Sequence, residues 1–134
     1  MVDLETQRWI KTGEGLRLNF YIDTDGYKTI GWGRNLSQGI SVSEAELMFQ
    51  NDLKRALNEL EECSWYLIQP RNVKNALLNM NFNLGITKLL QFKKMIAALE
   101  KKDFTKASIE ALDSLWAKQV GERAKDIALM IRQG

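Results

Sequence analysis

Residues 16–34 read LRLNFYIDTDGYKTIGWGR. Apolar and polar side chains alternate from Leu16 to Phe20, which is the period-two pattern of a β-strand with one buried face. Asp25-Gly26 is a hairpin turn signal, and residues 27–30 favour extended structure. We therefore expect a small antiparallel ribbon in this stretch, the only convincing β element of the chain.

The other segments follow a helical period. A short helix is expected before the ribbon, with Trp9 and Ile10 pointing inward, and Ser41-Val-Ser-Glu44 is a capping box that opens a long helix. Beyond Pro70 every apolar stripe has helical spacing. The sequence predicts a mostly α, α+β fold in a single domain over 1–134, made of these parts: a helix at 2–12, a small β-bearing lobe at about 14–41, a linking helix at about 42–62 and a helical lobe at about 70–134.

The composition excludes several kinds of chemistry. The 134 residues include no histidine, which removes Ser–His and Cys–His triads and zinc sites with histidine ligands. The single cysteine, Cys63, forms neither an internal disulfide nor a zinc cluster. Catalysis would have to use carboxylates, hydroxyls, lysines or the backbone, and we expect no metal and no other cofactor.

Charge is divided unevenly along the chain. Residues 1–67 carry 7 Lys/Arg and 11 Asp/Glu, whereas residues 68–134 carry 12 and 6. A lysine-rich solvated surface explains this, and so does a basic half that attracts nucleic acid, a membrane surface or an acidic cell-wall polymer. Residues 1–10 lack a signal-peptide pattern, so we expect synthesis in a cytoplasm without signal peptide.

Two carboxylates occupy notable positions. Glu14 stands between two glycines at the end of the first helix, and Asp23 follows nine residues later, before the ribbon turn. Glycosidases need such a pair, because one acid protonates the departing oxygen while the other carboxylate activates water or attacks carbon. By itself the pair is weak evidence, since most such pairs are solvated surface. The acidic run 23–26 does not fit an EF-hand loop in either frame.

Longer motifs add a family resemblance. Glu14-Gly-Leu-Arg-Leu followed by Tyr21-Ile-Asp-Thr-Asp-Gly-Tyr-Lys-Thr-Ile-Gly-Trp-Gly33 resembles the signature of phage-type lysozymes (glycoside hydrolase family 24), especially the T-even phage branch. The similarity continues through Ser43-Glu-Ala-Glu, Asn79-Met-Asn-Phe-Asn-Leu-Gly85 and Glu122-Arg-Ala-Lys125, so it covers most of the chain.

This resemblance implies an endolysin, a muramidase that hydrolyses the β-1,4 bond between N-acetylmuramic acid and N-acetylglucosamine. By family analogy Glu14 is the general acid, Asp23 is the general base or electrostatic partner, and Thr29 positions the attacking water. The implied geometry is inverting.

The family also implies binding and supporting residues. Phe82 would line the cleft, Arg123 would contact Glu14, and Asn35 and Asn83 would contact sugar. The partners implied are peptidoglycan glycan strands, with no nucleic acid and no stable membrane insertion, and the protein would be a monomer. It would be made in the host bacterial cytoplasm and reach the wall through a separate holin-like factor.

The sequence departs from the family at a few positions. Arg34 stands where the family usually has histidine, and we expect it to pair with Asp52, as that histidine does in T-even relatives. The loop from Ser37 to Ile40 is much shorter than in those relatives. Met95 and Glu110 occupy two further sugar-contact positions.

Three alternatives remain open at this stage. A lytic transglycosylase would cleave the same bond with the muramic 6-hydroxyl as nucleophile, although such enzymes typically need one acid only. A non-catalytic cell-wall-binding module would have no need of the whole Glu14, Asp23 and Thr29 set. Nucleic-acid binding through the basic half would require a tight, salt-dependent affinity.

Overall fold

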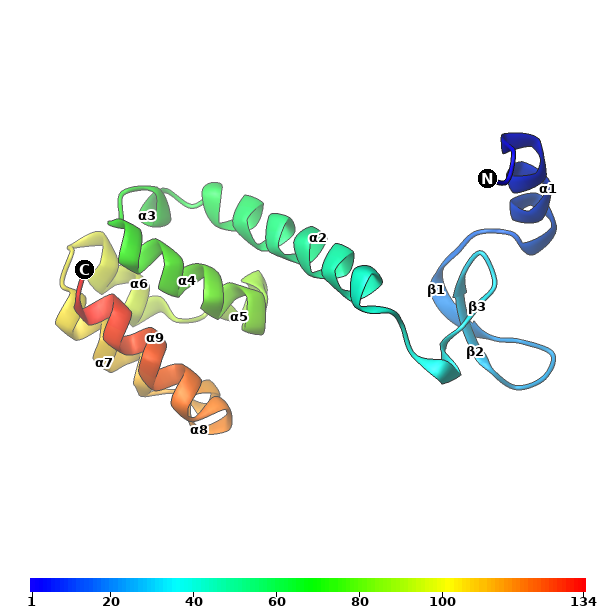
Figure 1. Ribbon diagram of the computed structural model, residues 1–134. Helices are drawn as coiled ribbons and strands as arrows, with labels where there is room; N and C mark the ends of the chain where they lie inside the picture. Colours follow the sequence, from blue (N-terminus) through cyan, green and yellow to red (C-terminus); the bar gives the residue numbers. More distant parts are fainter. The chain divides into compact units, whose positions relative to one another are not determined.

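The structure, a computed structural model, describes all 134 residues, which form two compact units, Met1–Leu47 (unit 1) and Met48–Gly134 (unit 2). The expected mostly helical α+β fold is confirmed, with one three-stranded antiparallel sheet (Figure 1). In chain order the elements are α1 Leu4–Glu14, β1 Arg17–Ile22, β2 Lys28–Gly31, β3 Arg34–Asn35, a 3₁₀ turn η1 Leu36–Gln38, α2 Val42–Glu61, α3 Ser64–Leu67, α4 Arg71–Leu84, α5 Ile86–Leu89, α6 Lys93–Glu100, α7 Phe104–Leu112, α8 Leu115–Val120 and α9 Glu122–Arg132.

Helix α1 lies two residues further along the chain than the expected helix at 2–12. The Asp3 carboxylate accepts a hydrogen bond from the Thr6 amide (2.7 Å), which satisfies one of the free amides at the helix start. Gly13 lies inside the helix, and Gly15 ends it with a φ of 74°, a conformation that favours glycine. The capping residues therefore determine the helix boundaries.

The sheet places Thr29 in its central strand. In the antiparallel pairing of β1 with β2, Tyr21 stands opposite Thr29, and the register shifts between Arg17 and Tyr21. Strand β3 pairs antiparallel with β2 and puts Asn35 opposite Thr29 on the other side. This third strand was not expected, because two residues are too few to give a period-two pattern. Thr29 is consequently flanked by a strand on both sides.

Unit 1 has little buried apolar surface. Thr29 is its one buried residue. Trp9 and Ile10, which we expected to point inward, are 76% and 55% exposed, and α1 has no buried residue. Polar contacts connect the parts instead, and among them the Lys11 ammonium lies 4.1 Å from the centre of the Trp32 ring.

The start of α2 forms the expected capping box. The Ser41 hydroxyl accepts from the Glu44 amide (3.2 Å), and the Glu44 carboxylate accepts from the Ser41 amide (2.9 Å). Helix α2 then continues for 20 residues, close to the predicted 42–62.

Arg34 has an ion-pair partner within unit 1: it donates to both carboxylate oxygens of Glu44, at 2.9 and 2.7 Å. The physical reason for this pair is local: the capping box already fixes the Glu44 carboxylate, which can accept both arms of a guanidinium in parallel. Asp52 lies 3.3 Å from Arg55, one turn along the same helix. The expected pair of Arg34 with Asp52 joins residues of different units and stays a prediction.

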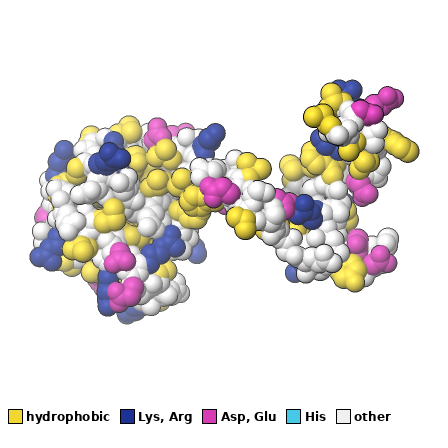
Figure 2. Space-filling model, in the orientation of Figure 1, with side chains coloured by type: hydrophobic (Ala, Val, Ile, Leu, Met, Phe, Trp, Pro, Cys, Tyr) yellow, Lys and Arg dark blue, Asp and Glu magenta, His cyan; other side chains and the backbone are white.

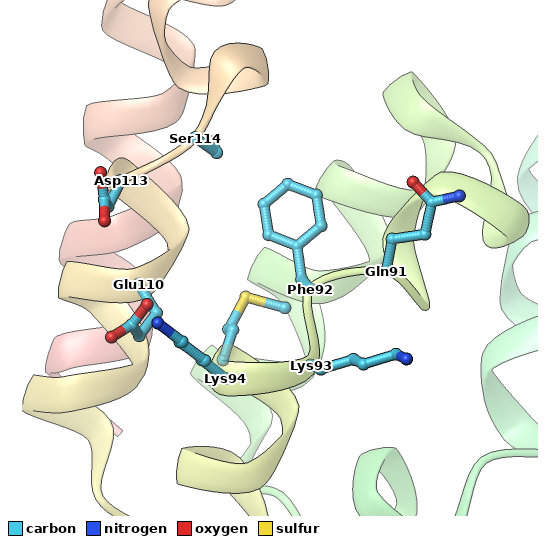
Figure 3. Close-up of a pocket in the computed structure, with 8 residues that line it drawn as sticks. Gln91, Phe92, Lys93, Lys94, Glu110, Asp113 and Ser114 are labelled. Carbon is cyan, nitrogen blue, oxygen red and sulfur yellow. The ribbon is translucent and has the colours of Figure 1, made fainter.

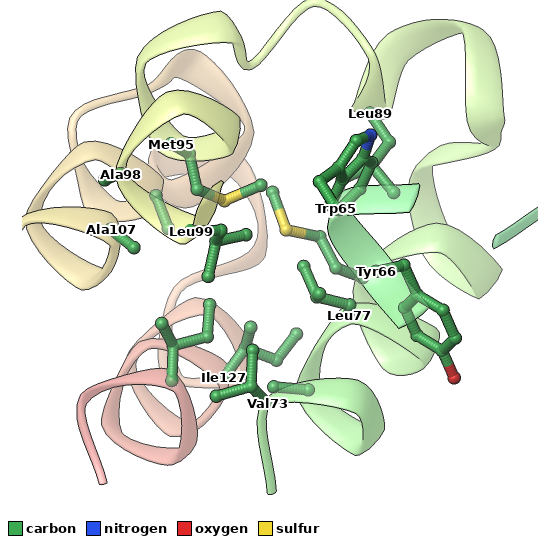
Figure 4. Packing of buried hydrophobic residues seen from close by; sticks show 14 of the residues in the cluster. Trp65, Tyr66, Val73, Leu77, Leu89, Met95, Ala98, Leu99, Ala107 and Ile127 are labelled. Atoms are coloured by element: carbon green, nitrogen blue, oxygen red, sulfur yellow. The ribbon is translucent and has the colours of Figure 1, made fainter. Parts of the chain in front are cut away.

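Unit 2 is built around a hydrophobic core (Figure 4). The helical spacing predicted beyond Pro70 is confirmed in α4, where the apolar stripe of Val73, Ala76, Leu77 and Met80 is fully buried. Helix α9 packs against α4 and α7, and α6 packs against α7. The core also includes Leu89 at the end of α5 and Leu99 of α6. No helix in the structure is both long and apolar enough to span a bilayer.

The Arg34–Glu44 pair makes stability depend on pH. The hydrogen bond from the Arg34 guanidinium, with those from Ser41, lowers the pKa of the Glu44 carboxyl from 4.5 to about 2. A carboxyl whose pKa is lower in the folded state stabilises the fold above its unfolded pKa, and this contribution is lost as the pH falls toward the folded pKa.

Glu44→Gln keeps an acceptor for Ser41 but removes the charge. We expect its melting temperature to lie below that of the wild type by a constant amount above about pH 5. The difference should disappear between pH 4.5 and about 2. A difference that is unchanged at pH 2.5 would contradict the assignment.

Candidate active site

Glu14 lies against the turn between β2 and β3. A Cβ atom built on Gly33 would stand 2.5 Å from Glu14 Oε2 and 3.1 Å from its carboxyl carbon. Gly33 has a φ of +77°, so glycine suits this position both for its backbone conformation and for the space above it. The carboxylate at the end of α1 therefore rests directly on the backbone of the turn.

The same turn of α1 makes a second contact nearby. Lys11, one helical turn before Glu14, places its ammonium over the ring of Trp32, the neighbour of Gly33. Two side chains from one face of the helix thus contact two consecutive residues of the turn. Together they fix the C-terminal end of α1 relative to the sheet.

Asp23 is held by the turn that it starts. Its Oδ1 accepts hydrogen bonds from the amides of Asp25 (2.9 Å) and Tyr27 (2.8 Å), while its own amide donates to the Tyr27 carbonyl (2.9 Å). Asp and Asn side chains commonly close turns in this way. Oδ2 makes no hydrogen bond within the chain, so a carboxylate of fixed orientation still presents one oxygen for chemistry.

Thr29 is 3% exposed, and its hydroxyl donates to the Tyr27 carbonyl at 3.0 Å. Because the hydroxyl proton is used in this bond, the oxygen faces any further partner as an acceptor. Tyr27 contacts Asp23 through its amide and Thr29 through its carbonyl. The two candidate groups are thus connected by one residue.

Unit 2 contains a cavity of about 400 Å³ that includes two of the predicted residues, Phe82 and Arg123. The Phe82 ring packs against that of Phe49, with centroids 5.4 Å apart. Arg123 donates from Nε to the side-chain oxygen of Asn79 (2.9 Å) and from Nη2 to its carbonyl (3.4 Å). The lining therefore combines apolar side chains with two asparagines, Asn75 and Asn79, and the Arg123 guanidinium.

Asn83 is tied to a tryptophan. The Trp116 indole donates to Asn83 Oδ1 at 2.7 Å, and Phe92 meets Trp116 edge to face at 6.1 Å. Asn35, the other predicted sugar contact, belongs to unit 1 and accepts from the Ser37 amide at 2.8 Å. In both asparagines the side-chain amide oxygen thus already accepts a hydrogen bond.

Met95 and Glu110 line a second cavity of unit 2, of about 380 Å³ (Figure 3). Lys93 and Lys94 lie on its α6 side, and Lys94 extends toward Glu110 on α7. The cavity therefore has charged groups of both signs around an apolar base.

Basic and acidic side chains are interspersed over the visible face of unit 2, with no continuous basic stripe (Figure 2). No group of three or more His, Cys, Asp or Glu side chains has the arrangement of a metal site.

Comparison with known proteins identifies the family. The phage lysozyme family profile matches residues 11–133. The chain belongs to the phage lysozyme family. It is 29% identical to a probable T4-type lysozyme 2 of Dictyostelium discoideum, covering 93% of this chain and 92% of that protein. It is also 30% identical to the pre-baseplate central spike protein Gp5 of Enterobacteria phage T4, over 93% of this chain and 27% of that protein.

Family membership supports a glycoside hydrolase that acts on peptidoglycan. The alignments run over 156 residues, more than the 134 of this chain, so the relatives have residues without a counterpart here. The contact expected between Arg123 and Glu14 joins residues of different units and stays a prediction.

Several residues of this phage lysozyme family member were missed by the sequence analysis. Asn79 holds Arg123 across 44 residues of sequence, and no local pattern indicates such a pairing. Gly33 belongs to the family motif, but nothing in the motif indicates that the Glu14 carboxylate lies against it. The capping box identified Glu44 as a helix cap but not as the partner of Arg34. The nearness of Glu44 to Arg34 in the sequence was the available signal.

The contact between the Glu14 carboxylate and Gly33 can be tested by replacing two glycines with alanine. Gly31 and Gly33 both have positive φ, but only at Gly33 would the new methyl group meet Glu14. We expect Gly31→Ala and Gly33→Ala to lose similar stability, about 1–2 kcal/mol, from backbone strain. Only Gly33→Ala should also lose wall hydrolysis, because it displaces the carboxylate. Thermal unfolding measures the loss of stability, and turbidity clearing measures wall hydrolysis. Equal clearing by both variants would contradict the claim that Gly33 holds the Glu14 carboxylate in place.

Proposed function

We propose that the chain is a muramidase that hydrolyses the β-1,4 bond between N-acetylmuramic acid and N-acetylglucosamine in peptidoglycan. Family membership supports the class of reaction. The observation that carries the proposal is the arrangement in unit 1. Glu14 rests on Gly33, Asp23 keeps one free oxygen on a fixed carboxylate, and the buried hydroxyl of Thr29, whose proton is given to the Tyr27 carbonyl, keeps its oxygen as an acceptor.

The proposed reaction needs one proton donor and one proton acceptor. Protonated Glu14 donates to the glycosidic oxygen while the bond between that oxygen and the anomeric carbon breaks. Water, held by Thr29, forms the new bond to the anomeric carbon and gives a proton to the free oxygen of Asp23. One water is consumed, and the muramic acid product has a reducing end. Attack from the face opposite the leaving group inverts the configuration.

The remaining predicted residues have supporting roles in the proposal. Phe82 offers an aromatic face to sugar, and Asn79 holds Arg123 at the edge of the same cavity. Asn35 and Asn83 contact sugar through the amide nitrogens that their hydrogen bonds leave free. The protein acts as a monomer on glycan strands, without a cofactor, and a separate holin-like factor releases it from the cytoplasm where it is made.

Replacement of the acid gives the first test. Glu14→Gln is nearly isosteric but has no transferable proton, so kcat should fall about 10²-fold or more while the melting temperature changes little. Glu5→Gln, the same change near the other end of α1, is the matched control and should keep full activity. The assay digests purified peptidoglycan and determines the released fragments by mass spectrometry.

The fragments separate the proposed reaction from its alternatives. Muramic acid with a reducing end supports hydrolysis, whereas a 1,6-anhydro end would identify a transglycosylase. If Glu14→Gln releases fragments as fast as the wild type, Glu14 is not the acid.

Asp23→Asn tests the other carboxylate. The amide oxygen of asparagine can still accept from the amides of Asp25 and Tyr27, so the turn should persist and the melting temperature should stay within a few degrees of the wild type. The charge and the free carboxylate oxygen are lost, and we expect kcat to fall by about 10²-fold. An unchanged kcat in a folded Asp23→Asn would remove Asp23 from the mechanism.

A further inference from the structure

The pair formed by Arg34 and Glu44 has two parallel hydrogen bonds. Nη1 lies 2.9 Å from Oε1 and Nη2 lies 2.7 Å from Oε2. The side chains are 48% and 38% exposed, and exposed pairs contribute little to global stability. Two parallel bonds do, however, fix the relative orientation of the planar groups, which a single contact would leave free. Besides its pH-dependent contribution to stability, the pair can therefore orient a segment of the chain.

On one side, the pair holds the segment that borders the candidate site. Arg34 follows Gly33, on which Glu14 rests, and precedes Asn35, which stands opposite Thr29. Strand β3 has only two residues and lies at the edge of the sheet. A two-residue edge strand has few ladder hydrogen bonds of its own, so an additional attachment changes its freedom appreciably.

On the other side, the pair ends in the first turn of α2. Glu44 Oε1 also accepts from the Ser41 amide, so the carboxylate is oriented before Arg34 binds it. The pair closes a short loop, since ten residues separate Arg34 from Glu44 along the chain. The edge strand is thus attached to a regular helix rather than to another loop.

We infer that Glu44 is a positioning residue of the hydrolytic site, which acts through Arg34 to hold residues 33–35 beneath Glu14 and beside Thr29. The inference rests on the proposed function. Glu44 contacts neither substrate nor reacting atoms. Its loss leaves Glu14, Asp23 and Thr29 present but less well oriented, and misplacement of reacting groups lowers kcat rather than affinity.

The test compares Glu44→Gln, Arg34→Met and the double variant by steady-state kinetics on soluble peptidoglycan fragments. We expect each single variant to lower kcat about tenfold with KM changed less than about twofold. The double variant should be no slower than the singles, because the two side chains act as one unit. Arg34→Lys, which keeps the charge but loses the paired geometry, should have an intermediate kcat.

Ser41→Ala is the matched control. It removes the hydroxyl that accepts from the Glu44 amide but leaves the ion pair and the Ser41 amide, so it weakens the helix cap alone. Its melting temperature should fall while its kcat stays at the wild-type value. A Ser41→Ala variant as slow as Glu44→Gln would show that helix capping, and not positioning, explains the effect, and would overturn the inference.

A second measurement does not depend on turnover. Amide hydrogen exchange of residues 28–35 should be faster in Glu44→Gln than in the wild type and unchanged in Ser41→Ala. An active wild type with kcat unchanged in Glu44→Gln overturns the inference and leaves the proposed function standing. A wild type that releases no fragment with a reducing end overturns both.

Discussion

The carboxylate of Glu14 lies so close to the backbone of Gly33 that any side chain at position 33 would displace it. The arrangement of unit 1 depends on this contact. It brings the end of α1 to the turn between β2 and β3, and the residues that follow the turn pair with the strand of Thr29. Asp23 is fixed independently, by the amides of the turn that it begins. A helix end, a tight turn and the central strand of the sheet thus supply the three groups of the proposed mechanism.

The two units are stabilised by different interactions. Unit 2 has a continuous core of buried aliphatic and aromatic side chains, and removing one large member would cost about 2–5 kcal/mol. In unit 1 only Thr29 is buried, and caps, cation–π contacts and one ion pair connect its elements. Individually these contacts contribute about 1 kcal/mol or less. Unit 1 consequently depends on the precise position of many weak contacts, and single substitutions there alter geometry more readily than overall stability.

Much of the fold could be predicted because its signals are local. The capping box at Ser41, the hairpin signal at Asp25-Gly26 and the stripe of α4 each occupy a few neighbouring residues. Contacts between distant residues gave no such signal. Family analogy favoured Asp52, of the other unit, as the partner of Arg34, whereas within unit 1 the carboxylate of Glu44, oriented by the helix cap, binds it. For Asn79 and Arg123 the sequence contained no indication at all.

The hydrogen bond between Trp116 and Asn83 determines which way the side-chain amide of Asn83 is turned. An indole N–H only donates, so the amide oxygen of Asn83 must face it, and the amide nitrogen is left pointing elsewhere. Asn83 therefore offers both amide hydrogens to a ligand, and its oxygen keeps one lone pair beside the indole. In the proposed function these hydrogens donate to a sugar acceptor such as the carbonyl of an N-acetyl group. The buried Trp116 thus fixes the orientation of the side-chain amide of Asn83 at the surface.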